Sequence, residues 1–241
     1  MSLAVVVPTL EEQGNISRLM TRLKQVRDEL ECKFFLVFVN DEGRDYTSHL
    51  LSYFEKRYDF VRVIKRDRRR GLASAYFEGL RYAITKLDCD FVIQMDADLQ
   101  HPPEKIIDMY KKLNDGYEVV IASRFVNGSS VSGNRMMRIL LAKLFCYITN
   151  ILLNLRVRDS TSGFRGMRRK VALTILRQHL LSKGFAYQLE TLCSFRRNRF
   201  SIAEIPFHFS PRTNGKSKLF VFNMVEFMKC LLYSAFFDSR F

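Results

Sequence analysis

The sequence of 241 residues contains few prolines, five in all, and no tryptophan. It also contains only five cysteines, the residues on which disulfide-rich proteins and many zinc sites depend. No two cysteines form a C-x-x-C pair, and an odd number cannot all pair, so neither a disulfide framework nor a zinc site is predicted. We expect reduced thiols in the cytosol. The apolar run near the amino terminus has no basic residues before it and is cut by Pro8, so no signal peptide is expected.

Two common phosphate-binding loops are absent as well. No G-x-G-x-x-G follows the first apolar run, and no G-x-x-x-x-G-K-[ST] occurs in the chain. The first absence argues against a dinucleotide-binding fold, and the second argues against a P-loop enzyme.

Acidic residues are scarce in the second half of the chain. Residues 121–241 carry 20 Lys and Arg against 5 Asp and Glu, a net charge of +15, whereas residues 1–120 carry 19 against 20. The formal charge of +14 therefore comes from the second half. This uneven distribution predicts an anionic partner there: phosphate groups, an acidic membrane surface or nucleic acid.

The sequence also has little that could cross a membrane. Residues 136–155 are about long enough, but they include Arg138 and Lys143, and two cations in hydrocarbon would cost several kcal/mol. We therefore predict an amphipathic helix at a membrane surface over 135–155, with a buried packing helix as the alternative. Residues 219–237 are rich in phenylalanine but interrupted by polar residues, which again favours an interfacial helix.

What the sequence does contain is an alternation of short apolar runs with segments of helical periodicity. This alternation predicts an α/β fold with a doubly wound, mostly parallel, Rossmann-like sheet and right-handed crossovers. The predicted strands are residues 3–7, 34–39, 61–64, 91–93 and 118–122.

Polar residues follow each predicted strand. Because the carboxyl ends of parallel strands meet at one edge of a sheet, we expect five loops to converge on one crevice. These loops begin at Pro8 and Thr9, Asp41, Gly71, Asp96 and Asp98, and Ser123 and Arg124.

The fourth predicted strand delivers two carboxylates to this edge. Asp96 and Asp98 are separated by one residue and are followed by Gln100. Asp98 and Gln100, with Asp96 nearby, can hold a hard cation such as Mg²⁺ or Mn²⁺, which prefers oxygen ligands and bridges phosphates. His101 is a weaker candidate ligand. The alternative is that the aspartates are ordinary turn residues before a helix that begins with two prolines.

The stretch FVIQMDADLQHPPE resembles the metal-binding motif of family 2 glycosyltransferases with a GT-A fold, and in particular the polyprenyl-phosphate sugar transferases typified by dolichol-phosphate mannose synthases. The resemblance covers nearly the whole chain. Other segments similar to this subfamily are PTLEE at 8–12, GLASA at 71–75, Ser123 with Arg124, DSTSGFR at 159–165, SKGFAYQLE at 182–190, and Arg212 with Gly215, Ser217 and Lys218. The Q-x-x-R-W motif of cellulose and hyaluronan synthases is absent.

The resemblance implies metal-dependent, inverting transfer of a hexose from a nucleotide sugar to dolichyl or undecaprenyl phosphate. Mannose from GDP-mannose is the first expectation, and glucose from UDP-glucose is the alternative. No general base is assigned, because a lipid monophosphate with a second pKa of roughly 6 is largely dianionic at pH 7. The implied site residues are Pro8, Thr9, Glu12, Asp41, Gly71 and Asp96 for the nucleotide sugar; Asp96, Asp98 and Gln100 for the metal; Arg124, Arg138, Arg212 and Lys218 for the acceptor phosphate; and Asp96, Asp98 and Arg124 for catalysis.

The sequence departs from the subfamily pattern in two places. Asn40, Glu42 and Gly43 lie in a segment that usually reads D-D-G-S-x-D-x-T, and this segment lies near the nucleotide base in the family. The identity of the base is therefore open. Ala142 stands where relatives often have a serine, so one hydrogen bond to the acceptor phosphate is expected to be missing.

We expect residues 1–218 to form the GT-A domain, with a nucleotide-sugar half at 1–125 and an acceptor half at 126–218, and residues 219–241 to form an interfacial helix. The expected location is the cytoplasmic face of a membrane, as a peripheral protein without a nucleic-acid partner. Two other classes stay open: a non-catalytic protein whose basic half binds nucleic acid or an anionic membrane, and a degenerate transferase.

Overall fold

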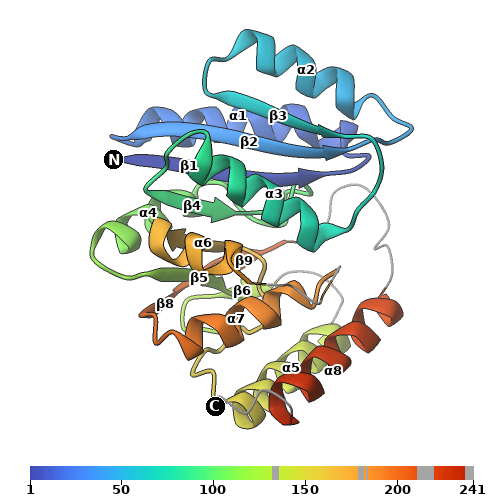
Figure 1. The fold of residues 1–241 in the computed structure, drawn as a ribbon, viewed down its shortest axis with the longest axis vertical. Helices are drawn as coiled ribbons and strands as arrows, with labels where there is room; N and C mark the ends of the chain where they lie inside the picture. The colour runs from blue at the N-terminus through green and yellow to red at the C-terminus, as the bar shows by residue number, and fades with distance from the viewer. Residues whose placement is uncertain (132–135, 179–181, 183, 211–219, 237–241) are drawn as a thin grey trace.

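The computed structural model describes residues 1–131, 136–178, 182, 184–210 and 220–236. Its centre is a seven-stranded sheet in the order β3-β2-β1-β4-β7-β5-β8 (Figure 1). Neighbouring strands run parallel except at β7, which is antiparallel to both β4 and β5. The strands are β1 (Ser2–Thr9), β2 (Lys33–Asp41), β3 (Val61–Arg66), β4 (Phe91–Gln94), β5 (Val119–Ser123), β7 (Arg165–Arg168) and β8 (Ile202–Pro206), and a separate parallel pair is formed by β6 (Ser130–Val131) and β9 (His208–Phe209).

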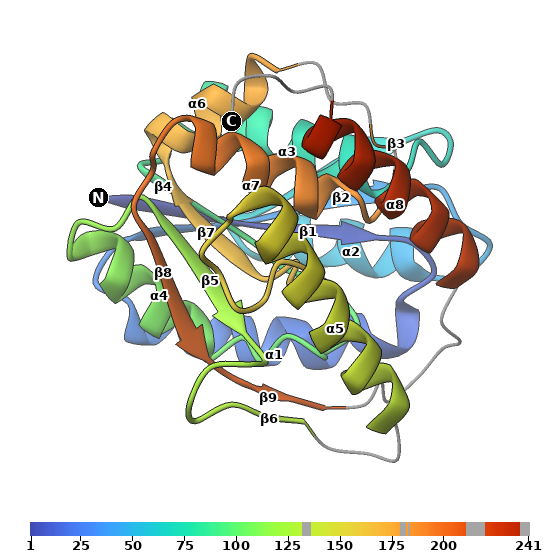
Figure 2. The ribbon, with the colours of Figure 1, turned by 90° about the horizontal axis from the view of Figure 1, so that it is seen from below.

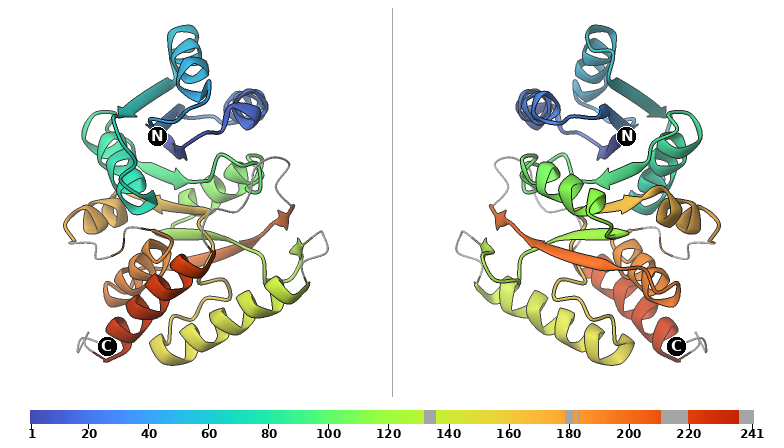
Figure 3. Two further views of the ribbon diagram at one scale, coloured as in Figure 1. Left: turned by 90° about the vertical axis from the view of Figure 1, so that its right-hand side faces the viewer. Right: turned by 90° about the vertical axis from the view of Figure 1, so that its left-hand side faces the viewer.

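The central strands form because their residues are apolar on both faces. In β1 all five residues from Leu3 to Val7 are completely buried, which requires cover on both sides of the sheet. Helices pack on each face and produce two hydrophobic cores; Figure 3 shows α3 and α6 on one side and α1 and α4 on the other. The first side has α3 (Leu72–Thr85), α6 (Arg169–Leu176) and α7 (Tyr187–Arg197), and the second has α1 (Gln13–Glu29), α2 (Thr47–Arg57) and α4 (Lys105–Asn114).

The predicted fold class, an α/β protein with a mostly parallel sheet, is confirmed, and the five predicted strands correspond to β1 to β5. The insertion of β7 between β4 and β5 was not predicted. A four-residue strand has too little periodicity to reveal its neighbours, and its place depends on distant contacts. Gly166 in β7 sits so tightly that a Cβ atom there would lie 3.2 Å from Ile93 Cγ1 and 3.1 Å from Leu113 Cδ1.

Two helices, α5 (Met136–Leu153) and α8 (Phe220–Phe236), lie side by side at the end of the molecule away from α2 (Figures 1 and 2). The Phe145 and Phe227 rings join them in an edge-to-face contact with centroids 5.7 Å apart. Much of their outer surface is apolar and exposed, through Leu140, Leu141, Leu144, Tyr147, Ile148, Ile151 and Leu152 of α5 and Met228, Leu232 and Tyr233 of α8. Among the described residues, no helix combines the length and apolar character needed to cross a membrane.

Candidate active site

Six of the seven strands end at the same edge of the sheet, and β1 to β5 among them are the five strands predicted to do so. Thr9 at the end of β1 pairs with Asn40, and Asp41 at the end of β2 pairs with Arg66. β4 and β5 run in the same direction because each is antiparallel to β7. The polar residues after these strands therefore share one rim, and the segment before β7 reaches the same rim from the opposite direction.

The loop after β4, residues 95–100, is called the acidic loop below. Asp98 is buried and its Oδ1 accepts the backbone N–H of Gln100 at 3.1 Å. Leu99 between them has φ 63°, a left-handed conformation that non-glycine residues rarely adopt and that is found often at functional sites. The Gln100 side-chain amide donates to the Ser210 carbonyl oxygen at 3.0 Å. The loop is thus sharply turned and held at both ends.

Asp96 is the more exposed carboxylate of the acidic loop, with 39% of its side chain accessible. The Tyr76 hydroxyl from α3 donates to Asp96 Oδ1 at 2.7 Å. Tyr76 is completely buried and stacks on Tyr187 of α7, whose hydroxyl accepts from the Gln94 amide at 2.9 Å. Burial and the Asp96 carboxylate together raise the pKa of Tyr76 well above its ordinary value, so the phenol keeps its proton and acts as a donor. No local pattern in the sequence indicates that α3 supplies this residue.

His101 supports the same loop from the inside. Its Nδ1 accepts the Asp96 backbone N–H at 2.9 Å, and its ring stacks on Phe164 with centroids 5.0 Å apart. Through these contacts His101 supports the acidic loop, and the metal-ligand role considered from the sequence stays a prediction.

The side chains of the acidic loop fit a Mg²⁺ or Mn²⁺ ion chemically. Asp96, Asp98 and Gln100 offer carboxylate and amide oxygens, the ligands that such hard cations prefer. Within the described part of the chain, no three His, Cys, Asp or Glu side chains form a complete cage for a metal. Proteins usually hold Mg²⁺ with one or two carboxylates, while substrate phosphates and water complete the coordination shell.

At the β2 and β3 end of the rim, Asp41 forms a buried ion pair with Arg66, whose Nε lies 2.5 Å from Asp41 Oδ1. Arg66 also donates to the Ser74 hydroxyl at 2.7 Å and to the Gly71 carbonyl at 3.4 Å. Gly71 has φ 92° and precedes α3, so a residue without a side chain is favoured there. The two predicted loops that begin at Asp41 and at Gly71 are joined in this way, although the sequence presents Arg66 only as one member of a basic run.

The other predicted nucleotide-sugar residues lie beside this pair. Thr9 donates its hydroxyl to Asn40 Oδ1 at 2.9 Å, and the Asn40 amide donates to Ser48 at 2.8 Å. Asn40, which departs from the subfamily pattern, is thus part of a buried network of hydrogen bonds. Glu12 donates its backbone N–H to Thr47 at 2.8 Å, and Pro8 precedes Thr9 at the end of β1.

Arg124, after β5, is held by a buried aspartate. Its Nε and Nη2 donate to the two Asp159 oxygens at 2.8 and 2.7 Å, and Nη2 also donates to the Thr161 hydroxyl at 2.5 Å. Burial alone would raise the pKa of Asp159, but the Arg124 guanidinium and its hydrogen bonds hold that pKa below the ordinary value. The carboxylate is therefore ionised and Arg124 has a bidentate partner. The sequence motif contains Asp159 but does not reveal the pairing.

Of the other residues predicted to bind the acceptor phosphate, one lies in a described helix and two do not lie in described segments. Arg138 lies in α5, and Arg212 and Lys218 lie outside the described residues.

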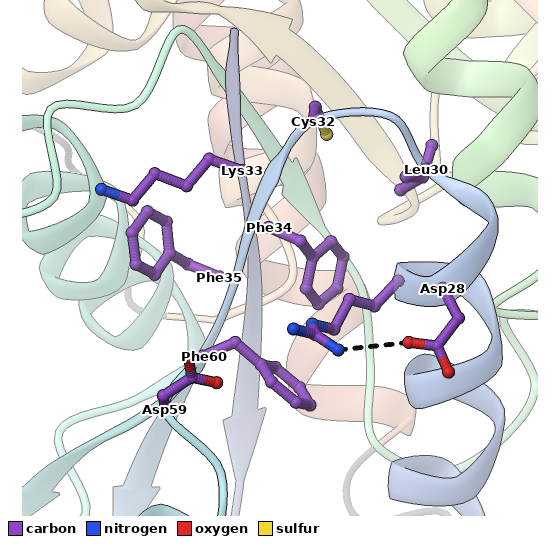
Figure 4. A pocket seen from close by; sticks show the side chains of 9 residues that line it. Asp28, Leu30, Cys32, Lys33, Phe34, Phe35, Asp59 and Phe60 are labelled. Atoms are coloured by element: carbon purple, nitrogen blue, oxygen red, sulfur yellow. Dashed lines mark hydrogen bonds and ion pairs between the residues drawn. The ribbon is translucent and has the colours of Figure 1, made fainter.

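A cavity of about 370 Å³ lies away from the rim, at the start of β2, where Phe34, Phe60 and the Arg27–Asp28 ion pair face it (Figure 4). Eight residue steps of β2 separate that end from Asp41, roughly 26 Å along the strand. This cavity is therefore not part of the rim.

Comparison with known proteins identifies the family. The family model for glycosyl transferase family 2 matches residues 4–176, more than half of the chain. The chain belongs to glycosyl transferase family 2. This membership makes it a glycosyltransferase and decides against the non-catalytic alternative.

Curated family members resemble the chain over most of its length. It is 31% identical to the dolichol-phosphate mannosyltransferase of Pyrococcus furiosus over 95% of the chain, but it spans only 62% of that relative. It is 32% identical to the Saccharomyces cerevisiae dolichol-phosphate mannosyltransferase over 90% of the chain and 80% of the relative. It is 28% identical to the polyprenol monophosphomannose synthase of Mycolicibacterium smegmatis over 93% of the chain and 83% of the relative.

Solved structures support the fold of this family member. Glucosyl-3-phosphoglycerate synthase from Mycobacterium tuberculosis, in complex with Mn²⁺, UDP and glucosyl-3-phosphoglycerate, matches with a TM-score of 0.69 at 18% identity, over 97% of this chain and 80% of that one. The same enzyme with Mg²⁺ and UDP matches with a TM-score of 0.68 at 17% identity, over 97% of this chain and 79% of that one. At these identities the likeness concerns the fold alone.

Proposed function

We propose that this chain catalyses the inverting transfer of mannose from GDP-mannose to a polyprenyl phosphate such as dolichyl or undecaprenyl phosphate. The observation that carries the proposal is the convergence at one rim of the acidic loop and the Arg124–Asp159 pair. Three curated relatives named for dolichol-phosphate or polyprenol mannosyl transfer support the choice of sugar and acceptor. Glucose from UDP-glucose is the second candidate, because the departures at Asn40, Glu42 and Gly43 leave the identity of the nucleotide base open.

The acidic loop is proposed to bind the diphosphate end of the donor. Asp98 and Gln100, with Asp96, would hold Mg²⁺ or Mn²⁺, which when bound would stabilise the negative charge that builds on the leaving diphosphate. Tyr76 fixes one Asp96 oxygen by its hydrogen bond, and His101 fixes the backbone of the same residue. The loop therefore needs little rearrangement when the donor arrives.

The β2 and β3 end of the rim is proposed to bind the nucleotide. Asp41 is 7% exposed and is held by its ion pair with Arg66. Thr9 and Glu12 border the same region through their bonds to the β2 loop and the start of α2. A buried ion pair with further hydrogen bonds resists displacement, so it provides a rigid wall for the nucleotide.

Arg124 is proposed to contact the acceptor phosphate, together with Arg138, Arg212 and Lys218. The acceptor attacks as a dianion, so no side chain has to remove a proton. What the protein must supply is cations and directed N–H donors that bind one anion beside another. The net charge of +15 over residues 121–241 supplies the required sign.

The outer faces of α5 and α8 are proposed to rest on the cytoplasmic surface of a membrane, as a peripheral attachment. Large apolar side chains are exposed on both helices, and Lys143 is exposed among those of α5. An apolar face with flanking cations suits an interface rather than water. This arrangement would bring a lipid phosphate close to the rim.

The test is a transfer assay with a panel of labelled nucleotide sugars, Mg²⁺ or Mn²⁺, and a short polyprenyl phosphate, in which label is followed into the organic phase. We expect label from GDP-mannose. Label from UDP-glucose alone would favour the second candidate. Donor hydrolysis without any lipid labelling would contradict the acceptor assignment.

A further inference from the structure

The orientation of the Arg124 guanidinium depends on one carboxylate. Asp159 accepts from Arg124 Nε, from Nη2 and from the Arg124 backbone N–H, at 2.8, 2.7 and 3.0 Å. The Asp159 side chain is completely inaccessible, whereas 18% of the Arg124 side chain is exposed at the rim. A planar guanidinium bound in this bidentate way has one orientation, so Asp159 decides where the remaining surface of Arg124 points.

Asp159 is itself held by its neighbours in the chain and by β8. Glu204 accepts the Arg158 and Asp159 backbone N–H groups at 2.7 and 3.0 Å. Ser162 donates its hydroxyl to the Ala122 carbonyl oxygen in β5 at 2.6 Å. The segment 157–162, called the positioning segment below, is therefore fixed to both strands that border it.

Helix α5 provides the third side of this support. Thr149 and Ser160 share a hydroxyl hydrogen bond at 2.9 Å, and the Asn150 side chain bonds both backbone groups of Val157. The Cys146 Sγ atom lies 3.9 Å from Asp159 Oδ1. Positions 146, 149 and 150 lie on one face of α5, so this inner face contacts the positioning segment. The outer face of α5 is apolar and exposed.

We propose that Asp159 is the positioning residue for Arg124, and that α5 fixes Asp159 through the positioning segment. Because the Asp159 anion balances the Arg124 cation, the pair contributes directed N–H donors to the acceptor phosphate and little net charge. The proposal rests on the proposed function, in which Arg124 contacts that phosphate. Residues 159–162 of the DSTSGFR motif would thus have a specific role, which is to fix the orientation of the Arg124 guanidinium.

The first test compares Asp159→Asn with the wild type, with rates normalised to the number of nucleotide-binding sites measured by calorimetry. We expect acceptor-dependent transfer per site to fall at least about tenfold, because hydrogen bonds to charged groups are lost and orientation with them. Donor hydrolysis without acceptor should stay within about twofold of wild type, and the acceptor KM should not rise, because the Arg124 charge is no longer balanced. Equal losses of transfer and hydrolysis would overturn the proposal.

Milder variants keep the test valid if Asp159→Asn folds poorly. Thr161→Val removes one acceptor of Arg124, and we expect a several-fold loss of transfer that Thr161→Ser restores. Thr174→Val is the matched control, because Thr174 is also half-buried and, among the residues that the structure describes, its hydroxyl bonds the Lys170 carbonyl oxygen within α6, at 3.0 Å. Transfer by Thr161→Ser as low as that by Thr161→Val would contradict a role for the hydroxyl.

A measurement without substrates separates this proposal from the proposed function. In ¹⁵N NMR spectra, the Arg124 Nε–H peak, assigned by its absence in Arg124→Lys, should be single and slow to exchange with solvent. Asp159→Asn should broaden or shift it, whereas Thr174→Val should not. An unchanged peak in folded Asp159→Asn would overturn the proposal even if lipid transfer is found, and the expected change would support it even if the acceptor is a different phosphate.

Discussion

Among single residues, Tyr76 has the most specific predicted effect, because it holds the exposed carboxylate of the acidic loop. Tyr76→Phe keeps the ring that stacks on Tyr187 and removes only the hydrogen bond to Asp96. We expect a loss of about tenfold to a hundredfold in kcat for sugar transfer, since a hydrogen bond to a charged group contributes about 1.5–3 kcal/mol. Steady-state kinetics with saturating donor and metal measures this.

Tyr82→Phe is the control for that variant, because Tyr82 lies on the same helix and no contact of its hydroxyl with the acidic loop is observed among the described residues. Its kcat should match the wild type. Equal kcat values for Tyr76→Phe and the wild type would show that the orientation of Asp96 does not depend on the phenol.

The buried tyrosines also predict how stability responds to alkaline pH. Burial raises the pKa of the Tyr187 phenol to about 12, from an ordinary value of 10. A raised folded-state pKa means that the stabilisation is fully present below pH 10 and is lost as pH rises from 10 through 12. Near pH 11 this group contributes a slope of up to about 1.4 kcal/mol per pH unit.

Urea denaturation of the wild type and Tyr187→Phe between pH 9 and 11.5 checks this expectation. Cys89 and Cys230 also have pKa values raised by burial to about 12, so the wild-type slope alone is not diagnostic. The difference between the two proteins isolates Tyr187. Identical slopes above pH 10 would contradict the assignment of a raised pKa to this residue.

At the scale of elements, the close approach of α3 to β1 and β2 places Tyr76 above the rim. Gly79 permits this approach, since a Cβ atom there would lie 2.3 Å from Val6 Cγ1 and 3.0 Å from Val39 Cγ2. We expect Gly79→Ala to lower the unfolding free energy by about 1–3 kcal/mol through overpacking. Adding Val6→Ala should recover part of that loss, because the closest atom is then removed.

A double-mutant cycle by urea denaturation measures the coupling between these positions. Gly116→Ala is the comparison: Gly116 has φ +112°, but a Cβ atom there would meet no described atom within 4 Å. It should therefore lose stability by backbone strain without coupling to Val6→Ala. Strict additivity of Gly79→Ala and Val6→Ala would contradict the packing argument.

The helices and strands also show which features of the fold can be predicted from sequence patterns. Apolar runs and helical spacing are local, and they predicted β1 to β5, the shared rim and the acidic loop. Pairing between distant segments is not local, so the position of β7 between β4 and β5 was not predicted, and neither were the partners of Asp41 and Arg124. Arg165 illustrates the limit: it is completely buried and bonds three carbonyl oxygens and the Thr191 hydroxyl, although arginines are usually exposed.

At the scale of the whole molecule, the basic half and the exposed faces of α5 and α8 predict attachment to an anionic membrane. Tyr147 on α5 is 65% exposed, so Tyr147→Glu should leave the fold intact. We expect it to weaken binding to phosphatidylcholine–phosphatidylserine vesicles by about tenfold, through lost apolar contact and added repulsion. Vesicle sedimentation at fixed salt measures this.

Tyr53→Glu is the matched control, because Tyr53 is 56% exposed on α2, at the opposite end of the molecule from α5 and α8 (Figure 1). It makes the same change of charge and size away from the proposed surface. If both variants bind vesicles as well as the wild type does, α5 is not the attachment surface.

The acidic loop at the carboxyl edge of the sheet is proposed to be the reaction centre, and Asp98→Ala removes one of its two carboxylates. We expect sugar transfer to fall at least about a hundredfold, with the unfolding midpoint and vesicle binding close to wild type. Chelation of divalent cations should abolish wild-type transfer, and added Mg²⁺ or Mn²⁺ should restore it. Transfer by Asp98→Ala close to the wild-type rate would show that the acidic loop is not the reaction centre.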